Sequence, residues 1–296
     1  MASGPGEYSI TVAGGDERQL AVVRVLVEGG FQVRLIGLGK GGNMPVFYGD
    51  TWQEALDGAS LLLLPISGVS LHGEIKTVVR GDNLFLDDEF WRYIPEQTVV
   101  LTGSWPCHLR KNAAAKNLRV FEYAEMDEIA VPNAIPTAEG ALQIAINELP
   151  ITIHGSNVLI LGFGRVAVAA ARLFASAGAS VYIAARRPEA RAIATLSGYR
   201  GINLPDLKDF VGRMDLIINS IPSLVLTRNE LEHVSRDSLI VDLASAPGGV
   251  DFMAAKEFGV KAVLALGLPG KVAPKTAGQI LASTLPAMIR RILCLP

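Results

Sequence analysis

The chain has 296 residues, a formal net charge of −2 and a sequence pI near 6.1. Half of its residues are hydrophobic and 19% are charged, which excludes a disordered chain and gives enough length for two domains of ordinary size. Because the charge is nearly balanced and no dense basic cluster occurs, we expect no general attraction to nucleic acid or acidic lipid. No apolar run approaches membrane-spanning length, and the first ten residues lack the basic and apolar regions of a secretory signal. We therefore expect a cytoplasmic protein.

The cysteines and histidines predict neither a disulfide framework nor a metal site. Cys107 and Cys294 are far apart in the sequence. The four histidines are scattered, without the spacing to cysteines or carboxylates that metal sites have.

Residues 8–37 predict a strand, a turn at Gly14-Gly15, an amphipathic helix, a glycine break and a second strand. The turn places three polar residues at the carboxyl end of a strand, where α/β sheets bind ligands: Asp16, Arg18 and Gln19. We predict that they contact a substrate. The alternative is that the aspartate caps the helix and that the charges behind it are solvated.

The rest of the N-terminal half continues this alternation of strands and helices. Strands are predicted over 59–65, 96–103 and 118–121, and helices over 51–56 and 106–116. The loops after the strands would lie at one edge of the sheet. Three hydroxyl residues in these loops are candidates to bind a small polar ligand, although turn formation explains them equally well: Ser67, Thr102 and Ser104.

A linker with two prolines is predicted over 131–136, followed by a helix over 137–148 that Thr137 would cap. This helix would connect the two domains, so that Thr137 and Glu139 could face a cleft between them. For Glu139 the alternative is a first-turn acid that the helix dipole favours. The expected domains are 1–135, joined by the terminal helix 275–296, an interdomain helix 136–150, and a nucleotide-binding domain 151–274.

Residues 157–187 form the most informative stretch, a strand–turn–helix–strand unit with the pattern G-x-G-x-x-A. Gly162 permits the tight turn after the strand 158–161, and Gly164 lets the backbone approach a pyrophosphate. Ala167 lets the helix lie close to the sheet. The backbone N–H groups at the start of the helix, around Arg165 and Val166, would then bind the phosphates of a dinucleotide.

The end of the second strand, 181–185, predicts NADP rather than NAD. An NAD site usually has Asp or Glu here to bind the ribose hydroxyls, whereas this chain has Ala184 and Ala185. Arg186 and Arg187 follow, and guanidinium groups can bind a 2′-phosphate; Arg186 is the stronger candidate. The alternative is that both arginines are solvated residues before a helix that Pro188 begins.

Three further strands, predicted over 214–219, 238–242 and 260–265, imply a mostly parallel sheet. Residues after the strands and in the terminal helix are predicted to contact the cofactor: Asn219, Ser220, Pro222, Ala244, Leu268 and Gln279. The fold class expected from these elements is α/β with two doubly wound domains, a flavodoxin- or Rossmann-like N-terminal domain and a C-terminal Rossmann domain, separated by a cleft.

Hydride transfer also requires a group that moves the matching proton. The candidate catalytic residues are Lys275, His154 and Glu139. His154 has a suitable intrinsic pKa, but it comes just before a predicted strand and would then be a hinge or structural residue. The terminal helix, with Lys275 and Thr276 in its first turn, is expected to pack on the first domain. Arg18 and Lys275 would then hold two carboxylates of a substrate.

Six strings make the chain resemble the A subunits of dipicolinate synthase nearly from end to end: AGGDERQ at 13–19, NAIPTAEGALQIAI at 133–146, TIHGSNVLILGFGRV at 152–166, NSIPS at 219–223, VDLASAPGG at 241–249 and ALGLPGKVAPKTAGQILA at 265–282.

The resemblance implies an NADP-linked oxidation of dihydrodipicolinate, or of its hydroxylated tetrahydro precursor, to dipicolinate. It further implies a separate, flavoprotein-like B subunit, together with a place in the mother cell of a sporulating bacterium. Whether the chain forms a homo-oligomer is left open by the sequence. Two alternatives are a non-catalytic subunit that binds NADP or serves as a scaffold, and a dehydrogenase that acts on another small carboxylic acid.

Overall fold

The computed structural model describes residues 5–39, 44–77 and 83–295, which form two compact units. The first unit comprises Met1–Ala130 and Pro274–Pro296, and the second comprises Val131–Ala273. The chain therefore leaves the first unit, builds the second, and returns to the first.

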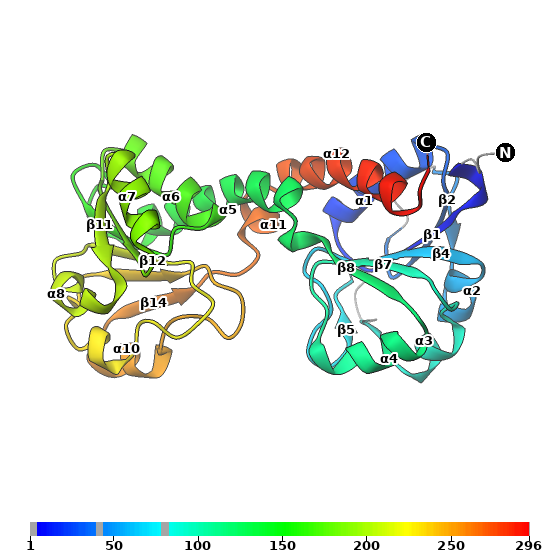
Figure 1. The fold of residues 1–296 in the computed structure, drawn as a ribbon, viewed down its shortest axis with the longest axis horizontal. Coiled ribbons are helices and arrows are strands. Elements are labelled where there is room, and N and C mark those ends of the chain that lie inside the picture. Colours follow the sequence, from blue (N-terminus) through cyan, green and yellow to red (C-terminus); the bar gives the residue numbers. More distant parts are fainter. Residues whose placement is uncertain (1–4, 40–43, 78–82, 296) are drawn as a thin grey trace. The chain divides into compact units, whose positions relative to one another are not determined.

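The first unit is built on a six-stranded sheet whose strands are all parallel (Figure 1). Its spatial order is β3 (Phe47–Tyr48), β2 (Gln32–Ile36), β1 (Ser9–Ala13), β4 (Ala59–Leu63), β7 (Val99–Thr102) and β8 (Arg119–Glu122). The order reverses direction between β1 and β4, which is where open α/β sheets place ligands.

Helices cover both faces of this sheet: α1 (Glu17–Glu28) and α12 (Pro274–Ile292) lie together on one face, and α2 (Trp52–Leu56), α3 (Asp88–Tyr93) and α4 (Arg110–Ala115) lie on the other (Figure 1). Short additional elements are η1 (Pro5–Glu7), η2 (Cys107–Leu109), η3 (Tyr123–Glu125) and the antiparallel pair β5 (Glu74–Ile75) and β6 (Leu84–Phe85).

The helix α12 belongs to the first unit because its apolar stripe packs on α1. Leu281, Leu285 and Ile289 are buried in the same cluster as Val22 and Leu26. A Cβ at Gly278 would lie 3.3 Å from the Cβ of Ala21, so the glycine allows the two helices to approach closely.

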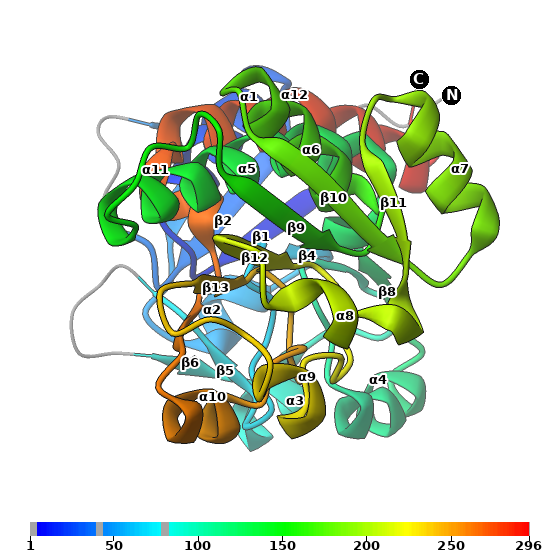
Figure 2. The same cartoon turned by 90° about the vertical axis from the view of Figure 1, so that its left-hand side faces the viewer.

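The second unit repeats the plan with a parallel sheet in the order β11 (Arg200–Asn203), β10 (Ser180–Ala185), β9 (Asn157–Leu161), β12 (Leu216–Asn219), β13 (Leu239–Asp242) and β14 (Lys261–Leu264). In Figure 2, β10, β9 and β12 run side by side. Both sheets have the Rossmann strand order, so the prediction of two doubly wound α/β domains is confirmed.

The helices of this half of the chain are α5 (Asp127–Glu148), α6 (Arg165–Ser176), α7 (Pro188–Leu196), α8 (Lys208–Val211), α9 (Arg228–Leu231), α10 (Phe252–Phe258) and α11 (Leu268–Val272), with a short turn η4 (Leu204–Asp206). The short helix α11 follows the last strand. Gly267 begins it with a φ of 68°, a conformation that glycine adopts without strain.

The predicted linker 131–136 is wrong, because these residues are helical and α5 begins at Asp127. Prolines lack the N–H that a helix interior uses, which is why Pro132 and Pro136 suggested a linker. Packing overrides this local preference, since buried alanines recur along one face of the helix: Ala134, Ala138, Ala141 and Ala145. Thr137 consequently lies inside the helix, where its hydroxyl donates to the carbonyl of Asn133 over 2.8 Å instead of capping a first turn.

Candidate functional site

The turn between β9 and α6 lies at the point where the strand order of the second sheet reverses. Gly162 has a φ of 95°, and a Cβ there would lie 2.7 Å from Oγ of Ser220. Gly164 is the N-cap of α6. Apart from its chain neighbours and the backbone of its own helix, no heavy atom of the described residues lies within 4 Å of where its Cβ would be, and no described side chain caps the helix. The N–H groups of the first turn, which includes Arg165 and Val166, therefore face a position that a phosphate can approach.

Asn219, predicted to contact a cofactor, is instead fully buried and supports the loop after β12. Its Nδ2 donates to Oδ1 of Asp242 over 2.8 Å and to the carbonyl of Ile221 over 3.0 Å, and its Oδ1 accepts from the N–H of Ile221 over 3.1 Å. Ser220 donates through Oγ to the carbonyl of Leu161 over 2.8 Å, which ties β12 to β9. Pro222 is exposed beyond them.

Asp242 is a supporting residue that the sequence reasoning missed. It is fully buried at the end of β13, and besides Asn219 it accepts from the N–H groups of Ala244 over 3.1 Å and Gly249 over 2.9 Å. A carboxylate that ends an otherwise apolar strand was the available signal. The backbone N–H of Ala244 thus points to the aspartate and its side chain is buried, whereas its predicted contact with a cofactor stays a prediction.

Leu268, which was predicted to contact the cofactor, has its side chain in the core. It is buried in α11, and a Cβ on Gly140 of α5 would lie 2.9 Å from its Cβ, so its side chain fills the core between these helices.

The carboxyl end of β10 carries the charges that the sequence predicted. Ala184 and Ala185 are buried, whereas Arg186 and Arg187 are exposed. Within the part of the chain that the structure describes, neither guanidinium has a hydrogen-bond or ion-pair partner. Arg187 is the N-cap of α7, which no side chain caps, so free N–H groups and two cations lie together.

Glu139 lies on a groove of about 630 Å³ within the second unit, between α5 and α6. Exposed apolar side chains of Val131 and Ile135 line it, together with Arg165 and Arg172.

His154 precedes β9 and therefore lies at the amino edge of the sheet, opposite the Gly162 turn. Its ring is packed so closely on Gly178 that a Cβ there would lie 2.3 Å from Cδ2. This placement favours the structural alternative for His154.

In the first unit, Asp16 caps α1 and orients Arg18. It accepts from the N–H of Arg18 over 3.0 Å, and its Oδ2 lies 2.6 Å from Nη2 of the guanidinium. Burial raises the pKa of the Asp16 carboxyl, but the hydrogen bonds and the charge of Arg18 outweigh burial and hold this pKa below its usual range. Beside this pair, burial raises the pKa of Tyr123 far above its ordinary value, and its hydroxyl donates to the carbonyl of Leu64 over 2.9 Å.

Two other predicted substrate contacts are corrected because their side chains are buried and serve the backbone. Gln19 donates to the carbonyl of Leu64 over 3.3 Å, and Thr102 donates to the carbonyl of Ser104 over 3.0 Å. Ser67 and Ser104 stay exposed.

The glycine turn of the first unit is filled by the chain itself. The N–H of Gly15 donates to the carbonyl of Lys76 over 2.7 Å, and a Cβ on Gly14 would lie 2.7 Å from the same oxygen. A phosphate cannot take that place, so the first unit differs from the second in what its turn can bind.

The first turn of α12 exposes Lys275 and Thr276, and Gln279 is exposed one turn later. All three belong to the first unit.

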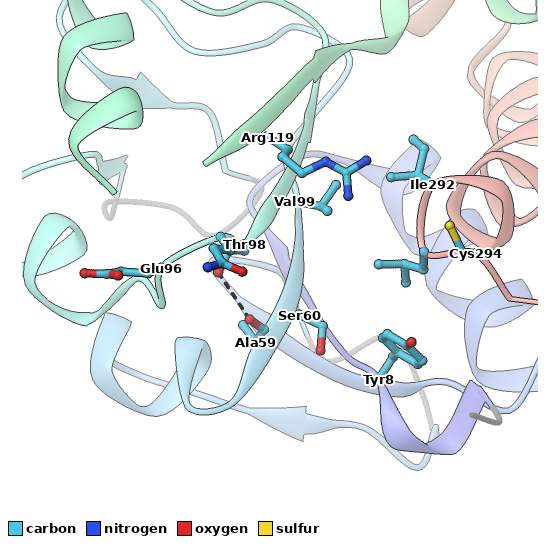
Figure 3. Close-up of a pocket in the computed structure, with 11 residues that line it drawn as sticks. Tyr8, Ala59, Ser60, Glu96, Thr98, Val99, Arg119, Ile292 and Cys294 are labelled. Atoms are coloured by element: carbon cyan, nitrogen blue, oxygen red, sulfur yellow. Dashed lines mark hydrogen bonds between the residues drawn. The ribbon is translucent and has the colours of Figure 1, made fainter. Parts of the chain in front are cut away.

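A second cavity, of about 430 Å³, lies at the amino edge of the first sheet, where the strands begin (Figure 3). The labelled residues around it include Tyr8, Ser60, Arg119 and Cys294. Because α/β sheets bind their ligands at the carboxyl edge, this cavity is not the candidate site. Among the described residues no group of three or more His, Cys, Asp or Glu could hold a metal, and none of the helices built from them could cross a membrane.

A family model for the N-terminal domain of the dipicolinate synthase A subunit matches residues 9–124. The A subunit of dipicolinate synthase from Bacillus subtilis (strain 168) is 38% identical over 288 residues, which cover 96% of this chain and 96% of that protein. The chain belongs to the family of dipicolinate synthase A subunits. The resemblance found in the sequence is thereby confirmed.

Solved structures from this family agree. The A subunit of dipicolinate synthase from Bacillus halodurans has a TM-score of 0.89 and 35% identity, covering 97% of this chain and 99% of that one. Its counterpart from Bacillus subtilis has a TM-score of 0.88 and 36% identity, covering 97% of each.

The second unit is a dehydrogenase-type domain. A family model for shikimate/quinate 5-dehydrogenase matches residues 143–262. A transhydrogenase from Sinorhizobium meliloti, at a TM-score of 0.70 and 17% identity over 97% of this chain and 94% of that one, shares the fold alone. The chain is thus an oxidoreductase-type protein, and its fold is one that holds nicotinamide cofactors.

Proposed function

We propose that the chain is a catalytic subunit of dipicolinate synthase that oxidises dihydrodipicolinate, or its 4-hydroxy-tetrahydro precursor, with NADP as the hydride acceptor. The observation that carries the cofactor assignment is the end of β10. It has no carboxylate, two exposed guanidinium groups without partners among the described residues, and an uncapped helix behind them.

The fit of a dinucleotide rests on the open turn at Gly164. The N–H groups at the start of α6 would bind the pyrophosphate, and Arg186 and Arg187 would bind the 2′-phosphate. The buried pair Asn219–Asp242 would keep the loops after β12 and β13 in shape beside the nicotinamide. When bound, NADP accepts the hydride.

Oxidation of the dihydropyridine ring removes one hydride and one proton and leaves an aromatic ring, so the reaction needs a base as well as a cofactor. The hydroxylated tetrahydro precursor must in addition lose one water to give the same product. Arg18, oriented by Asp16, and Lys275 are the proposed partners of the two substrate carboxylates. Thr276 and Ser67 are proposed as further substrate contacts. Glu139 is the proposed proton acceptor, because it is an exposed carboxylate on the second unit.

We further propose that this chain works with a B subunit in the mother cell of a sporulating bacterium. The support is the family name, since a relative called an A subunit has at least one further subunit. The alternative, a non-catalytic subunit that only binds NADP, keeps the same cofactor site and gives the chemistry to the partner.

A single assay separates these functions. The purified chain is mixed with NADP or NAD and freshly prepared dihydrodipicolinate, with and without the B subunit, and formation of NADPH and dipicolinate is followed. Activity of the chain alone supports the proposal. Dipicolinate formed only with the B subunit, and without NADPH, would assign the chemistry to the partner. NADPH formed only with another small carboxylic acid would assign a different substrate.

A further inference from the structure

Arg191 lies in α7, three residues after Pro188, and its side chain runs back to the carboxyl edge of the second sheet. Its Nη1 donates to three oxygens: the carbonyl of Arg186 at 2.7 Å, the carbonyl of Ala185 at 2.8 Å and Oδ1 of Asn203 at 3.2 Å. One nitrogen thus joins the ends of β10 and β11 to the helix that follows β10.

The first consequence is electrostatic. The carbonyls of Ala185 and Arg186 are the last one of β10 and the first one of the turn after it, and their oxygens carry partial negative charge. Such oxygens beside a phosphate would repel it. Both oxygens accept hydrogen bonds from the Arg191 guanidinium, whose positive charge offsets their partial negative charge.

The second consequence is geometric. Arg186 and Arg187 have free guanidinium groups within the described structure, so their directions depend on the backbone of the turn. Holding two consecutive carbonyls fixes that backbone. Asn203, in register with Ala185 on the neighbouring strand, accepts from the same nitrogen of Arg191 and so helps to hold the guanidinium in place.

Residues other than Arg191 also attach α7 to the sheet. Ala190 and Ala194 are buried and attach the helix to the sheet, whereas Arg191 is half-buried. Arg200 supplies a matched control: it donates through Nη1 to the hydroxyl of Tyr182 over 3.0 Å at the start of β11, in the same sheet but away from the carboxyl edge.

We propose that Arg191 is a specificity-determining positioning residue, which shapes the turn after β10 into a 2′-phosphate site without itself touching the phosphate. This inference rests on the NADP assignment proposed above and names a residue that determines it.

The test is a binding measurement with purified variants of the full chain. Dissociation constants for NADP and NAD are measured for the wild type, Arg191→Ala, Arg186→Ala, the double variant and Arg200→Ala. Arg191→Ala should raise the dissociation constant of NADP about tenfold, a typical coupling between neighbouring residues, and change that of NAD by no more than about twofold. Its effect should largely disappear in the Arg186→Ala background, because it acts through that residue. Arg200→Ala should change neither constant.

Asn203→Ala keeps every arginine and should weaken the binding of NADP several-fold. It replaces Arg191→Ala in the test if that variant fails to fold. An equal loss of NADP and NAD, or full additivity with Arg186→Ala, would overturn the positioning role. If Arg186→Ala abolishes the preference for NADP while Arg191→Ala and Asn203→Ala keep it, the inference fails and the cofactor assignment stands. A wild type without preference for NADP overturns both.

Discussion

The side-chain amide of Asn219 donates to Oδ1 of Asp242 over 2.8 Å, and both residues are fully buried. They are in register at the ends of β12 and β13. Because each side chain also bonds the backbone of the loop that follows, the pair couples two loops at the proposed nicotinamide site.

Asp242→Asn should therefore weaken both folding and cofactor binding. The new amide group would meet the donors of Gly249 or Asn219, so at least one buried donor loses its acceptor, at a cost of about 1–3 kcal/mol. Urea unfolding and a cofactor titration check this. Asp237→Asn, at an exposed position, is the control and should match the wild type. Wild-type stability in Asp242→Asn would contradict the network.

The two glycines of the β9–α6 turn should respond differently to alanine. Gly164→Ala places a methyl group in open space at an ordinary φ of −90°, so the free energy of unfolding should change by about 1 kcal/mol or less. Cofactor binding should nevertheless weaken strongly, because the methyl group would occupy the position open to a phosphate. Gly162→Ala combines a positive φ with a contact of 2.7 Å and should destabilise by about 1–3 kcal/mol. Equal stability loss in both variants would argue against the open position at Gly164.

Arg186→Ala should weaken the binding free energy of NADP by about 1.5–3 kcal/mol, the range for a hydrogen bond to a charged group, and leave the binding of NAD nearly unchanged. Arg187→Ala should have the smaller effect. Calorimetric titration with both nucleotides measures this. Parallel losses of NADP and NAD would remove Arg186 from the 2′-phosphate.

Lys275→Ala should lower kcat/KM for the dicarboxylate about tenfold or more and leave the dissociation constant of NADP unchanged, since the lysine is assigned to a substrate carboxylate. Lys271→Ala, which removes an exposed lysine of α11, is the control. An unchanged KM and kcat in Lys275→Ala would exclude this residue from the site.

The Asp16–Arg18 pair predicts a pH dependence with a defined sign. The folded pKa of Asp16 lies below its unfolded value of about 3.9, so the ionised pair stabilises the fold above that pH and loses this contribution as pH falls through the folded pKa. Asp16→Asn retains the helix cap, and its deficit in unfolding free energy should be about 1 kcal/mol or less near neutrality, because the carboxylate is 43% exposed. Unfolding curves at several pH values should show this deficit shrinking in acid; a constant deficit would contradict the assignment.

The sheets could be predicted from the sequence because their strands are continuous apolar runs between turn residues. The run 158–161 corresponds closely to β9, and the glycines after it mark the turn correctly. The start of α5 could not be predicted in this way. Pro132 and Pro136 disfavour a helix locally, while the buried alanine face that favours the helix is a property of packing.

Within the site, the position of a residue along a strand could be predicted from the sequence, but the direction of its side chain could not be predicted. Asn219 was expected to face a cofactor, yet its partner is Asp242, which lies 23 positions later. Nothing in the sequence indicated the role of Arg191, since its three acceptors come together only when β10, β11 and α7 have been assembled.

The return of α12 to the first unit affects the order in which the chain can fold during synthesis. Its residues Leu281, Leu285 and Ile289 cover α1, but a ribosome makes them only after the whole of Val131–Ala273. The second unit is a continuous segment and can fold as it emerges, whereas the half of the chain made first keeps the apolar face of α1 uncovered until the end. Nascent chains of this protein should therefore need chaperone protection mainly at their N-terminal half.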